Sequence, residues 1–328
     1  MTYVEIPDNR LDGRTRRLAF YLAAEEYLCR DSEPLFFIWN VTPTVIIGRN
    51  QILEKEVNTA YCREHNIDII RRKSGGGAVY ADMNNLMCSY ICPQTSVNQA
   101  FCTYMDKMRN ALKDMGLDVE KSDRNDLLLN GFKISGNAYY GHAGHSIIHG
   151  TMLFDTDIET MTCTLTPTKE KLQGKGVESV RSRVTNIKDF YKHGGLEDFK
   201  KHLRSTLCDA TLELTEKDIE EIEKIEQGYY SNTYFLRKNP PFTDIRKKYI
   251  PGVGNIEAAI DVKQGRIASI VFSGDFFYSS IEDVKMLQEY LKGVDFCPKE
   301  IEKRLAGIQV QDMISNLQAS ILTRFITD

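Results

Sequence analysis

Three consecutive glycines in RRKSGGGAVY, residues 71–80, make this stretch well suited to bind an anion. Residues without a Cβ let backbone N–H groups approach a ligand, and successive amides in a turn form an anion-binding concavity. The basic residues 71–73 add positive charge, and arginine can fork onto a carboxylate or phosphate. A lone GGG is more often a plain turn. Here apolar runs at 67–70 and 78–80 favour a strand–loop–strand whose loop faces an anionic ligand.

Lys133, in NGFKISGNAYY, is the second candidate. Its ammonium is a compact charge that suits a phosphate or a developing oxyanion. A solvent-facing strand lysine is the commoner case, but the adjacent Ser135-Gly136 exposes backbone here. Asn125 and Asp126 stand nearby, and such oxygen ligands can hold Mg2+ beside a nucleotide. A turn cap explains that pair equally well.

Two weaker candidates follow. The stretch GKGVESVRSRVTN, residues 174–186, contains Arg181 and Arg183 and suits either a loop that closes over a phosphate or a plain surface loop. Three histidines lie between residues 142 and 149 without an acid at metal-like spacing, so zinc is not expected. His149 is the one that we expect in a pocket wall.

Composition bounds the class of protein. The 328 residues are 42% hydrophobic and 27% charged, with a net charge of -4, which argues against a general nucleic-acid or membrane binder. We expect no membrane span, because no apolar stretch approaches 18 residues. The eight cysteines show no CxxC, and the first residues lack the apolar core of a secretory signal, so we expect a cytoplasmic protein. Rossmann, P-loop, α/β-hydrolase and zincin signatures are missing from the sequence.

Hydrophobic patterning predicts the elements that position these residues. Near-continuous apolar runs at 35–40, 44–48 and 86–92 are typical of strands in a sheet covered on both faces. An amphipathic helix is expected at 97–115, and Asn130-Gly131 is a strong two-residue hairpin signal. A proline-rich junction at 239–252 predicts a linker. We therefore expect two domains, 1–245 and 252–328, the second containing a hairpin at 255–272 followed by helices.

Four motifs together resemble the lipoate–protein ligase family in order and spacing. They are RRKSGGGAVYAD, RNDLLLNGFKISGNAYY, HGTMLFDTD and KGVESVRSRVTNI. The resemblance is specific over residues 35–186 and weaker in the tail. It implies an α+β fold of mixed β-sheets flanked by helices, shared with biotin–protein ligases and octanoyl transferases, plus a small α/β accessory domain.

The resemblance also implies a two-step reaction. Lipoate is activated with ATP, in the presence of Mg2+, to lipoyl-AMP and pyrophosphate. The lipoyl group then passes to a lysine on lipoyl domains of 2-oxo acid dehydrogenase complexes or on the glycine cleavage H protein. No nucleic acid and no membrane are expected as partners. Basic groups, backbone amides and Mg2+ are suitable means of neutralising the phosphate charge.

Site residues carry over by position. The family's ATP and adenylate contacts fall on Arg72, Gly77, Ala78, Val79, Tyr80, Asn125, Asp126 and Lys133, and the loop that closes over the adenylate contributes Arg181 and Arg183. The lipoate contacts fall on Arg72, Ser74, Gly75, Gly76, Lys133 and His149. Lys133 is the expected catalytic residue, touching both the acyl carboxylate and the α-phosphate, and Asp126 is the expected metal ligand. The strands at 35–48 and 86–92 would wall a tunnel for the acyl chain.

The sequence departs from the family at two positions and leaves other functions open. Ala81 replaces a usual histidine, and Asn137 replaces the commoner serine. One alternative is an ATP-independent octanoyl or lipoyl transferase of the same fold, which needs a reactive cysteine facing Lys133. Cys163 follows His149 most closely, and we interpret it as a buried or incidental thiol. A non-catalytic binder of lipoate-like acids is the other alternative, and Lys133 argues against it.

Overall fold

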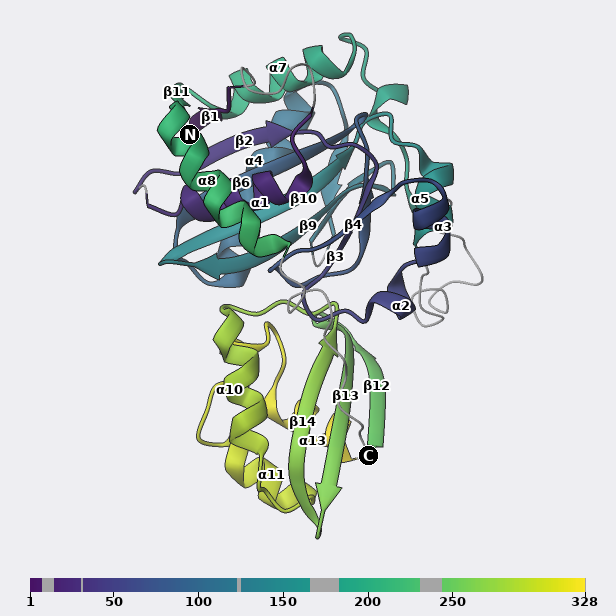
Figure 1. Cartoon of the computed structure of the whole chain (residues 1–328), viewed down its shortest axis with the longest axis vertical. Helices are drawn as coiled ribbons and strands as arrows, with labels where there is room; N and C mark the ends of the chain where they lie inside the picture. Colours follow the sequence, from purple (N-terminus) through teal and green to yellow (C-terminus); the bar gives the residue numbers. More distant parts are fainter. Residues whose placement is uncertain (8–14, 31, 123–124, 166–182, 231–243, 328) are drawn as a thin grey trace.

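The computed structural model describes residues 1–7, 15–30, 32–122, 125–165, 183–230 and 244–327. They form a larger N-terminal lobe and a smaller C-terminal lobe (Figure 1). Within these residues, no helix is both long enough and apolar enough to cross a membrane.

An eight-stranded mixed sheet forms the centre of the larger lobe, in the order β11-β1-β2-β6-β10-β9-β8-β7. β1 runs parallel to both neighbours, and the other pairs are antiparallel. The strands are β1 (Thr2–Glu5), β2 (Leu35–Trp39), β6 (Asn85–Pro93), β7 (Val119–Lys121), β8 (Asp126–Leu129), β9 (Phe132–His142), β10 (His145–Leu153) and β11 (Ala210–Glu213). The β8–β9 hairpin turns at Asn130 and Gly131, whose φ values of 53° and 81° confirm the predicted two-residue turn.

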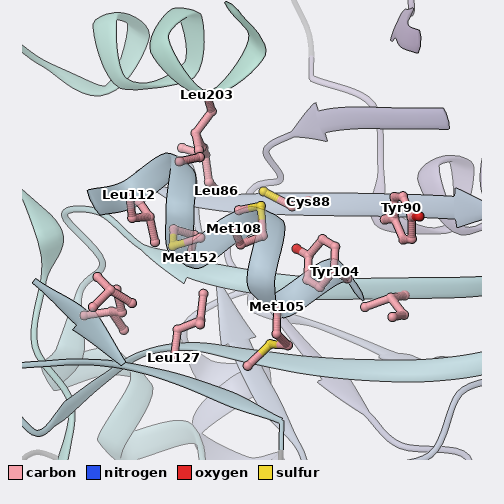
Figure 2. Packing of buried hydrophobic residues seen from close by; sticks show 14 of the residues in the cluster. Leu86, Cys88, Tyr90, Tyr104, Met105, Met108, Leu112, Leu127, Met152 and Leu203 are labelled. Atoms are coloured by element: carbon pink, nitrogen blue, oxygen red, sulfur yellow. The ribbon is translucent and has the colours of Figure 1, made fainter. Parts of the chain in front are cut away.

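Helices cover both faces of this sheet, as the apolar runs predict. α1 and α8 pack on one face, and α4 and α7 on the other. Their bounds are α1 (Leu18–Tyr27), α4 (Val97–Asp114), α7 (Leu196–Leu207) and α8 (Glu216–Tyr229). Neighbouring residues of one strand enter different cores: Phe36 packs under α4, whereas Phe37 packs under α1. Figure 2 shows the core under α4, where Cys88 of β6 lies beside Met108.

A second, three-stranded sheet carries the glycine-rich segment. β4 (Asp68–Arg71) and β5 (Val79–Ala81) pair with opposite edges of β3 (Thr44–Ile47). Residues 72–78, here called the glycine loop, join β4 to β5, which confirms the predicted strand–loop–strand. The short helices α2 (Leu53–Glu56), α3 (Thr59–Glu64) and α5 (Ile158–Thr164) contribute to the core beside this sheet, and a 3-10 turn, η2 (Ile187–Asp189), follows later in the chain.

The smaller lobe has a hydrophobic core of its own, drawn from residues 250–326. Its sheet is antiparallel, with β12 (Asp244–Ile250), β13 (Gly254–Lys263) and β14 (Arg266–Gly274). The helices are α10 (Ile281–Leu291), α11 (Pro298–Leu305), α12 (Val310–Met313) and α13 (Ala319–Thr327). The predicted linker is wrong at residues 244–250, because these residues pair with β13 as an edge strand. The sequence of β12, DIRKKYI, contains three basic residues, as is typical of an edge strand. They leave no apolar alternation from which the strand could be predicted.

Candidate active site

The glycine loop is packed so closely that a side chain has no room at several positions. Gly76 has a φ of +86°, in the region that favours glycine. A methyl group on Gly48, after β3, would lie 2.0 Å from the Gly76 carbonyl oxygen. A methyl group on Gly75 would lie 2.1 Å from the Phe276 carbonyl oxygen, in the segment after β14. The glycines therefore allow backbone segments from both lobes to meet.

The three cations beside the glycines are bonded to the protein itself. One terminal nitrogen of Arg71 donates to the carbonyl oxygens of residues 48, 49 and 51 at 2.7–3.1 Å. Arg72 donates to the carbonyl oxygens of residues 46, 75 and 77 at 2.7–3.2 Å. Lys73 pairs with Glu26 of α1 at 2.6 Å. Arg72 thus holds the loop's shape, whereas Arg71 holds the segment after β3 and Lys73 ties the loop to α1. Direct contact of Arg72 with a ligand stays a prediction.

A buried chain of hydrogen bonds connects the loop to α1. Ser74 Oγ lies 2.7 Å from His149 Nε2, and His149 Nδ1 lies 2.8 Å from Glu25 Oε2. Ser89 on β6 donates to Glu25 at 2.6 Å, and Trp39 Nε1 donates to Ser89 at 2.9 Å. His149 thus joins the glycine loop, and its place in a pocket wall stays a prediction. The sequence analysis missed Glu25, although a Glu-Glu pair on the apolar helix LAFYLAAEEY was an available signal.

Lys133 lies at the start of β9 and forms an ion pair with Asp126 at the start of β8, with 2.7 Å between Nζ and Oδ1. Both side chains are part-exposed, at 37% and 28%. Asn125 donates from Nδ2 to the Asn137 carbonyl oxygen, which fixes the strand beside this pair. The structure therefore brings together three of the predicted site residues, Lys133, Asn125 and Asp126.

The register of β9 and β10 relates Lys133 to the glycine loop. Gly136 pairs with Thr151, and Ala138 pairs with His149. Paired residues in antiparallel strands share a face, and so do residues two apart along a strand. A methyl group on Gly136 would lie 2.8 Å from Lys133 Nζ, so the ammonium occupies the face of Gly136 that also carries His149. Along β9, two residues, about 7 Å of strand, separate Gly136 from Ala138, the partner of His149.

Of the two departures from the family pattern, Asn137 faces away from this ammonium. Asn137 pairs with Gly150 and therefore faces the opposite side of the sheet, where it contacts Met105 of α4. A methyl group on Gly150 would lie 1.9 Å from Asn137 Oδ1, so the glycine makes room for the larger side chain. Ala81 is fully buried at the end of β5. The next residue, Asp82, accepts hydrogen bonds from backbone nitrogens, and burial raises the pKa of its carboxyl.

The other predicted nucleotide residues fall into two groups. Gly77 and Ala78 end the loop, whereas Val79 and Tyr80 belong to β5 and pair with β3. The Tyr80 side chain is 3% exposed in the core beside the small sheet. Arg181 lies outside the described residues. Arg183 is described, and Thr185 shortly after it donates its backbone N–H to the Lys133 carbonyl oxygen at 3.1 Å. This end of the predicted closing loop is thus attached to the lysine's strand.

The smaller lobe covers the glycine loop. The Phe277 ring lies against Gly76 and packs edge-on to Phe101 of α4, with ring centroids 5.1 Å apart. The Tyr278 hydroxyl donates to the Lys73 carbonyl oxygen. A cavity of about 50 Å³ between the lobes is lined by residues of 51–56, 247–257 and 273–274 and contains none of the predicted site residues. The predicted acyl tunnel along 35–48 and 86–92 stays a prediction.

Burial makes two of the cysteines poor candidates for thioester chemistry. Burial raises the pKa of Cys29 and of Cys88 to about 12, which makes both poor nucleophiles at neutral pH. Cys163 is exposed on α5, beside Tyr61 of α3, so its interpretation as buried is wrong.

Comparison with known proteins shows the family of this chain. Residues 17–208 match the lipoyl protein ligase A/B catalytic domain, and residues 239–326 match the bacterial lipoate protein ligase C-terminus. Lipoate-protein ligase LplJ of Bacillus subtilis is 35% identical over 309 residues, covering 90% of this chain and 92% of its own. Lipoate–protein ligase 1 of Staphylococcus aureus is 32% identical over 316 residues, covering 93% and 95%.

Solved structures show the same fold. LipL1 of P. falciparum in complex with lipoate has a TM-score of 0.75 at 19% identity, covering 96% of this chain and 95% of its own. A bi-partite lipoate protein ligase of Thermoplasma acidophilum, studied with its E2 lipoyl domain, has a TM-score of 0.60 at 26% identity, covering 73% and 98%. A lipoate-protein ligase A bound with ATP has a TM-score of 0.59 at 24% identity, covering 71% and 96%. The chain belongs to the lipoate–protein ligase family.

Proposed function

We propose that this protein is an ATP-dependent lipoate–protein ligase. The observation that carries the proposal is the position of the Lys133 ammonium on the same face of the sheet as the contact between His149 and the glycine loop. A carboxylic acid bound along this face has a cation at one end and backbone amides of the loop nearby. This arrangement suits a reaction in which negative charge moves between a carboxylate and a phosphate.

The chemistry has two steps. A lipoate carboxylate oxygen attacks the α-phosphorus of ATP. The bond between that phosphorus and the oxygen that bridges it to the β-phosphorus breaks, so that pyrophosphate departs and lipoyl-AMP is formed. An amine of the acceptor lysine then attacks the acyl carbon, expels AMP and loses a proton. Lys133 orients the carboxylate and stabilises charge on the α-phosphate, after exchanging its bond to Asp126 for bonds to the substrates.

Mg2+ fits this site through Asp126. Mg2+ is commonly held by one or two protein carboxylates together with substrate phosphates. Asp126 supplies one carboxylate at Lys133, and the described residues contain no group of three His, Cys, Asp or Glu that would bind the ion without a nucleotide. When bound, the ion would neutralise phosphate charge.

We propose lipoate as the small-molecule substrate and lipoyl domains as the acceptors, including those of 2-oxo acid dehydrogenase complexes and the glycine cleavage H protein. Family membership supports both. We also propose a cytoplasmic location, because all eight cysteines are free thiols.

We further propose that the two lobes are separate domains that move relative to one another, with the boundary before β12 rather than at residue 252. The separate core of residues 250–326 supports the division. The contacts of Phe277 and Tyr278 with the glycine loop would then open to admit the acid.

Pyrophosphate release tests the proposal. The protein is incubated with lipoate, Mg-ATP and an isolated lipoyl domain. Mass spectrometry of the lipoyl domain counts the lipoylated lysines, and we expect one pyrophosphate released for each of them. Lys133→Ala should abolish lipoyl-AMP formation. Lys188→Ala is the matched control, because Lys188 also pairs with an aspartate, Asp155, at 2.6 Å. Unchanged turnover in Lys133→Ala would overturn the site assignment.

The same assay separates the ligase from the transferase. Acyl transfer from an octanoylated carrier protein without ATP, together with no pyrophosphate from lipoate, would establish the transferase instead. The raised pKa values of Cys29 and Cys88 argue against these two thiols as the transferase nucleophile, and the assay decides for the exposed Cys163.

A further inference from the structure

The buried chain between the glycine loop and α1 has a fixed proton order at the end nearest the loop. Arg72 Nε can only donate, so Ser74 Oγ, 2.9 Å away, accepts its hydrogen. The Ser74 hydroxyl hydrogen is then free to point at His149 Nε2, at 2.7 Å. The Glu25 carboxylate at the other ring nitrogen can only accept, so in a neutral imidazole Nδ1 is the protonated nitrogen and Nε2 accepts from Ser74. Nδ1–H faces the two carboxylate oxygens of Glu25, at 2.8 and 3.0 Å.

The other end of the chain has the same polarity. Trp39 Nε1 can only donate, and it donates to Ser89 Oγ at 2.9 Å. Ser89 in turn donates to Glu25 Oε1 at 2.6 Å. Two runs of donors therefore converge on one carboxylate, which accepts from both. Glu25 is 0% exposed, so water does not compete for these bonds.

We propose that Glu25 is a positioning residue for the lipoate pocket: it holds His149 in the Nδ1–H tautomer and thereby sets the orientation of Ser74 and Arg72. Arg72 is the group that transmits the effect to the glycine loop, because its two terminal nitrogens hold the carbonyl oxygens of residues 46, 75 and 77. The effect on catalysis rests on the proposed ligase function, whereas the effect on the tautomer does not.

The Ser74–His149–Glu25 order also resembles a nucleophile triad. Ser74 is 0% exposed, and its oxygen already accepts from Arg72, so the structure assigns it to relay and not to attack. Labelling of Ser74 by a serine-directed fluorophosphonate would overturn this assignment.

The first measurement uses the wild-type protein. Long-range proton–nitrogen NMR spectra of protein labelled with 15N-histidine distinguish the two neutral tautomers. The five histidines other than His149 are assigned by substituting them one at a time, which identifies the remaining signal. We expect the Nδ1–H tautomer at His149, and an Nε2–H signal would overturn the proposal.

The second measurement uses Glu25→Gln. The carboxamide keeps one oxygen for Ser89 and places an NH2 donor against His149 Nδ1, so we expect the His149 signal to change to the Nε2–H tautomer. Ser74 Oγ then accepts from both Arg72 and His149, and its own hydrogen loses its acceptor. We expect the KM for lipoate to rise about 10- to 100-fold, the effect of losing the hydrogen bond between His149 and the charged Glu25. The KM for ATP should change less than threefold.

Glu26→Gln is the matched control. Glu26 is the adjacent residue on α1, is nearly as buried, and bonds Lys73 and Tyr229 instead of His149. Its variant should leave the His149 tautomer unchanged. If the wild-type protein is active and Glu25→Gln has an unchanged KM for lipoate, the inference about Glu25 is wrong and the proposed function stands. Wild-type protein that forms no adenylate would defeat the proposed function and leave the tautomer result standing.

Discussion

Gly136→Ala displaces the proposed catalytic ammonium without removing it. The added methyl group would lie 2.8 Å from Lys133 Nζ and 2.9 Å from Cε, whereas an ordinary contact is about 3.5 Å. The ammonium must therefore move by about 0.7 Å or more. A misplacement of about 1 Å can cost about 100-fold in rate, so we expect kcat/KM for adenylate formation to fall about 100-fold. The assay is pyrophosphate release with lipoate and Mg-ATP.

The same substitution should cost little stability. The clash involves the far end of a flexible side chain, and the ion pair with Asp126 is part-exposed, which limits its loss to about 0–1 kcal/mol. Gly131→Ala, in the turn of the same hairpin, is the matched control. Gly131 has a φ of +81° and nothing within 4 Å of an added methyl group, so its variant should lose about 1–2 kcal/mol through backbone strain and keep its activity.

A double-mutant cycle of Gly136→Ala and Lys133→Ala decides whether the loss of activity in Gly136→Ala is caused by displacement of Lys133. In a Lys133→Ala background, Gly136→Ala should cause no further loss of activity, because the displaced group is already gone. Activity of Gly136→Ala within threefold of wild type, or a further loss in the double variant, would refute the reasoning.

Three other substitutions test how the fold supports the site. Gly76 and Gly116 share left-handed φ values, +86° and +80°, so alanine is strained at both positions. Only Gly76→Ala also places a methyl group 2.9 Å from Arg72, so it should lower the thermal midpoint more than Gly116→Ala does. Equal shifts of the midpoint would contradict that reasoning. Phe277→Ala uncovers Gly76, so amide hydrogen exchange across the glycine loop should speed up while exchange in β13 stays constant; no change in the loop would count against the contact. Hydrogen bonds to Asp218, of which the one from Thr215 at the N-cap of α8 has the largest effect, hold the pKa of its carboxyl well below the ordinary value. The ionised carboxylate therefore stabilises the folded state above about pH 3.9, and this contribution is lost as pH falls below that value. Asp218→Asn should therefore cost about 1 kcal/mol at pH 7 and less at pH 3, by thermal midpoints, and an equal cost at both would argue against this linkage.

Local sequence properties were enough to predict much of the fold. The hairpin at Asn130-Gly131 follows from two residues that tolerate left-handed backbone, and the strands around the glycine loop follow from short apolar runs. The edge strand β12 did not follow, because its alternation is masked by exposed basic residues. Its pairing depends on β13, which the residues of β12 themselves do not specify.

The sequence by itself determined which residues we propose for the chemistry: three glycines in one loop, a lysine near Gly136, and a histidine on the neighbouring strand. Glycine placement and apolar periodicity are local, so they can be recognised without coordinates. Only the tertiary structure decided what those residues bond to. Glu25 meets His149 across 124 residues of chain, and the two arginines beside the glycines turn inward to backbone carbonyls. Periodicity shows which face a side chain takes, but its partner depends on how distant elements pack.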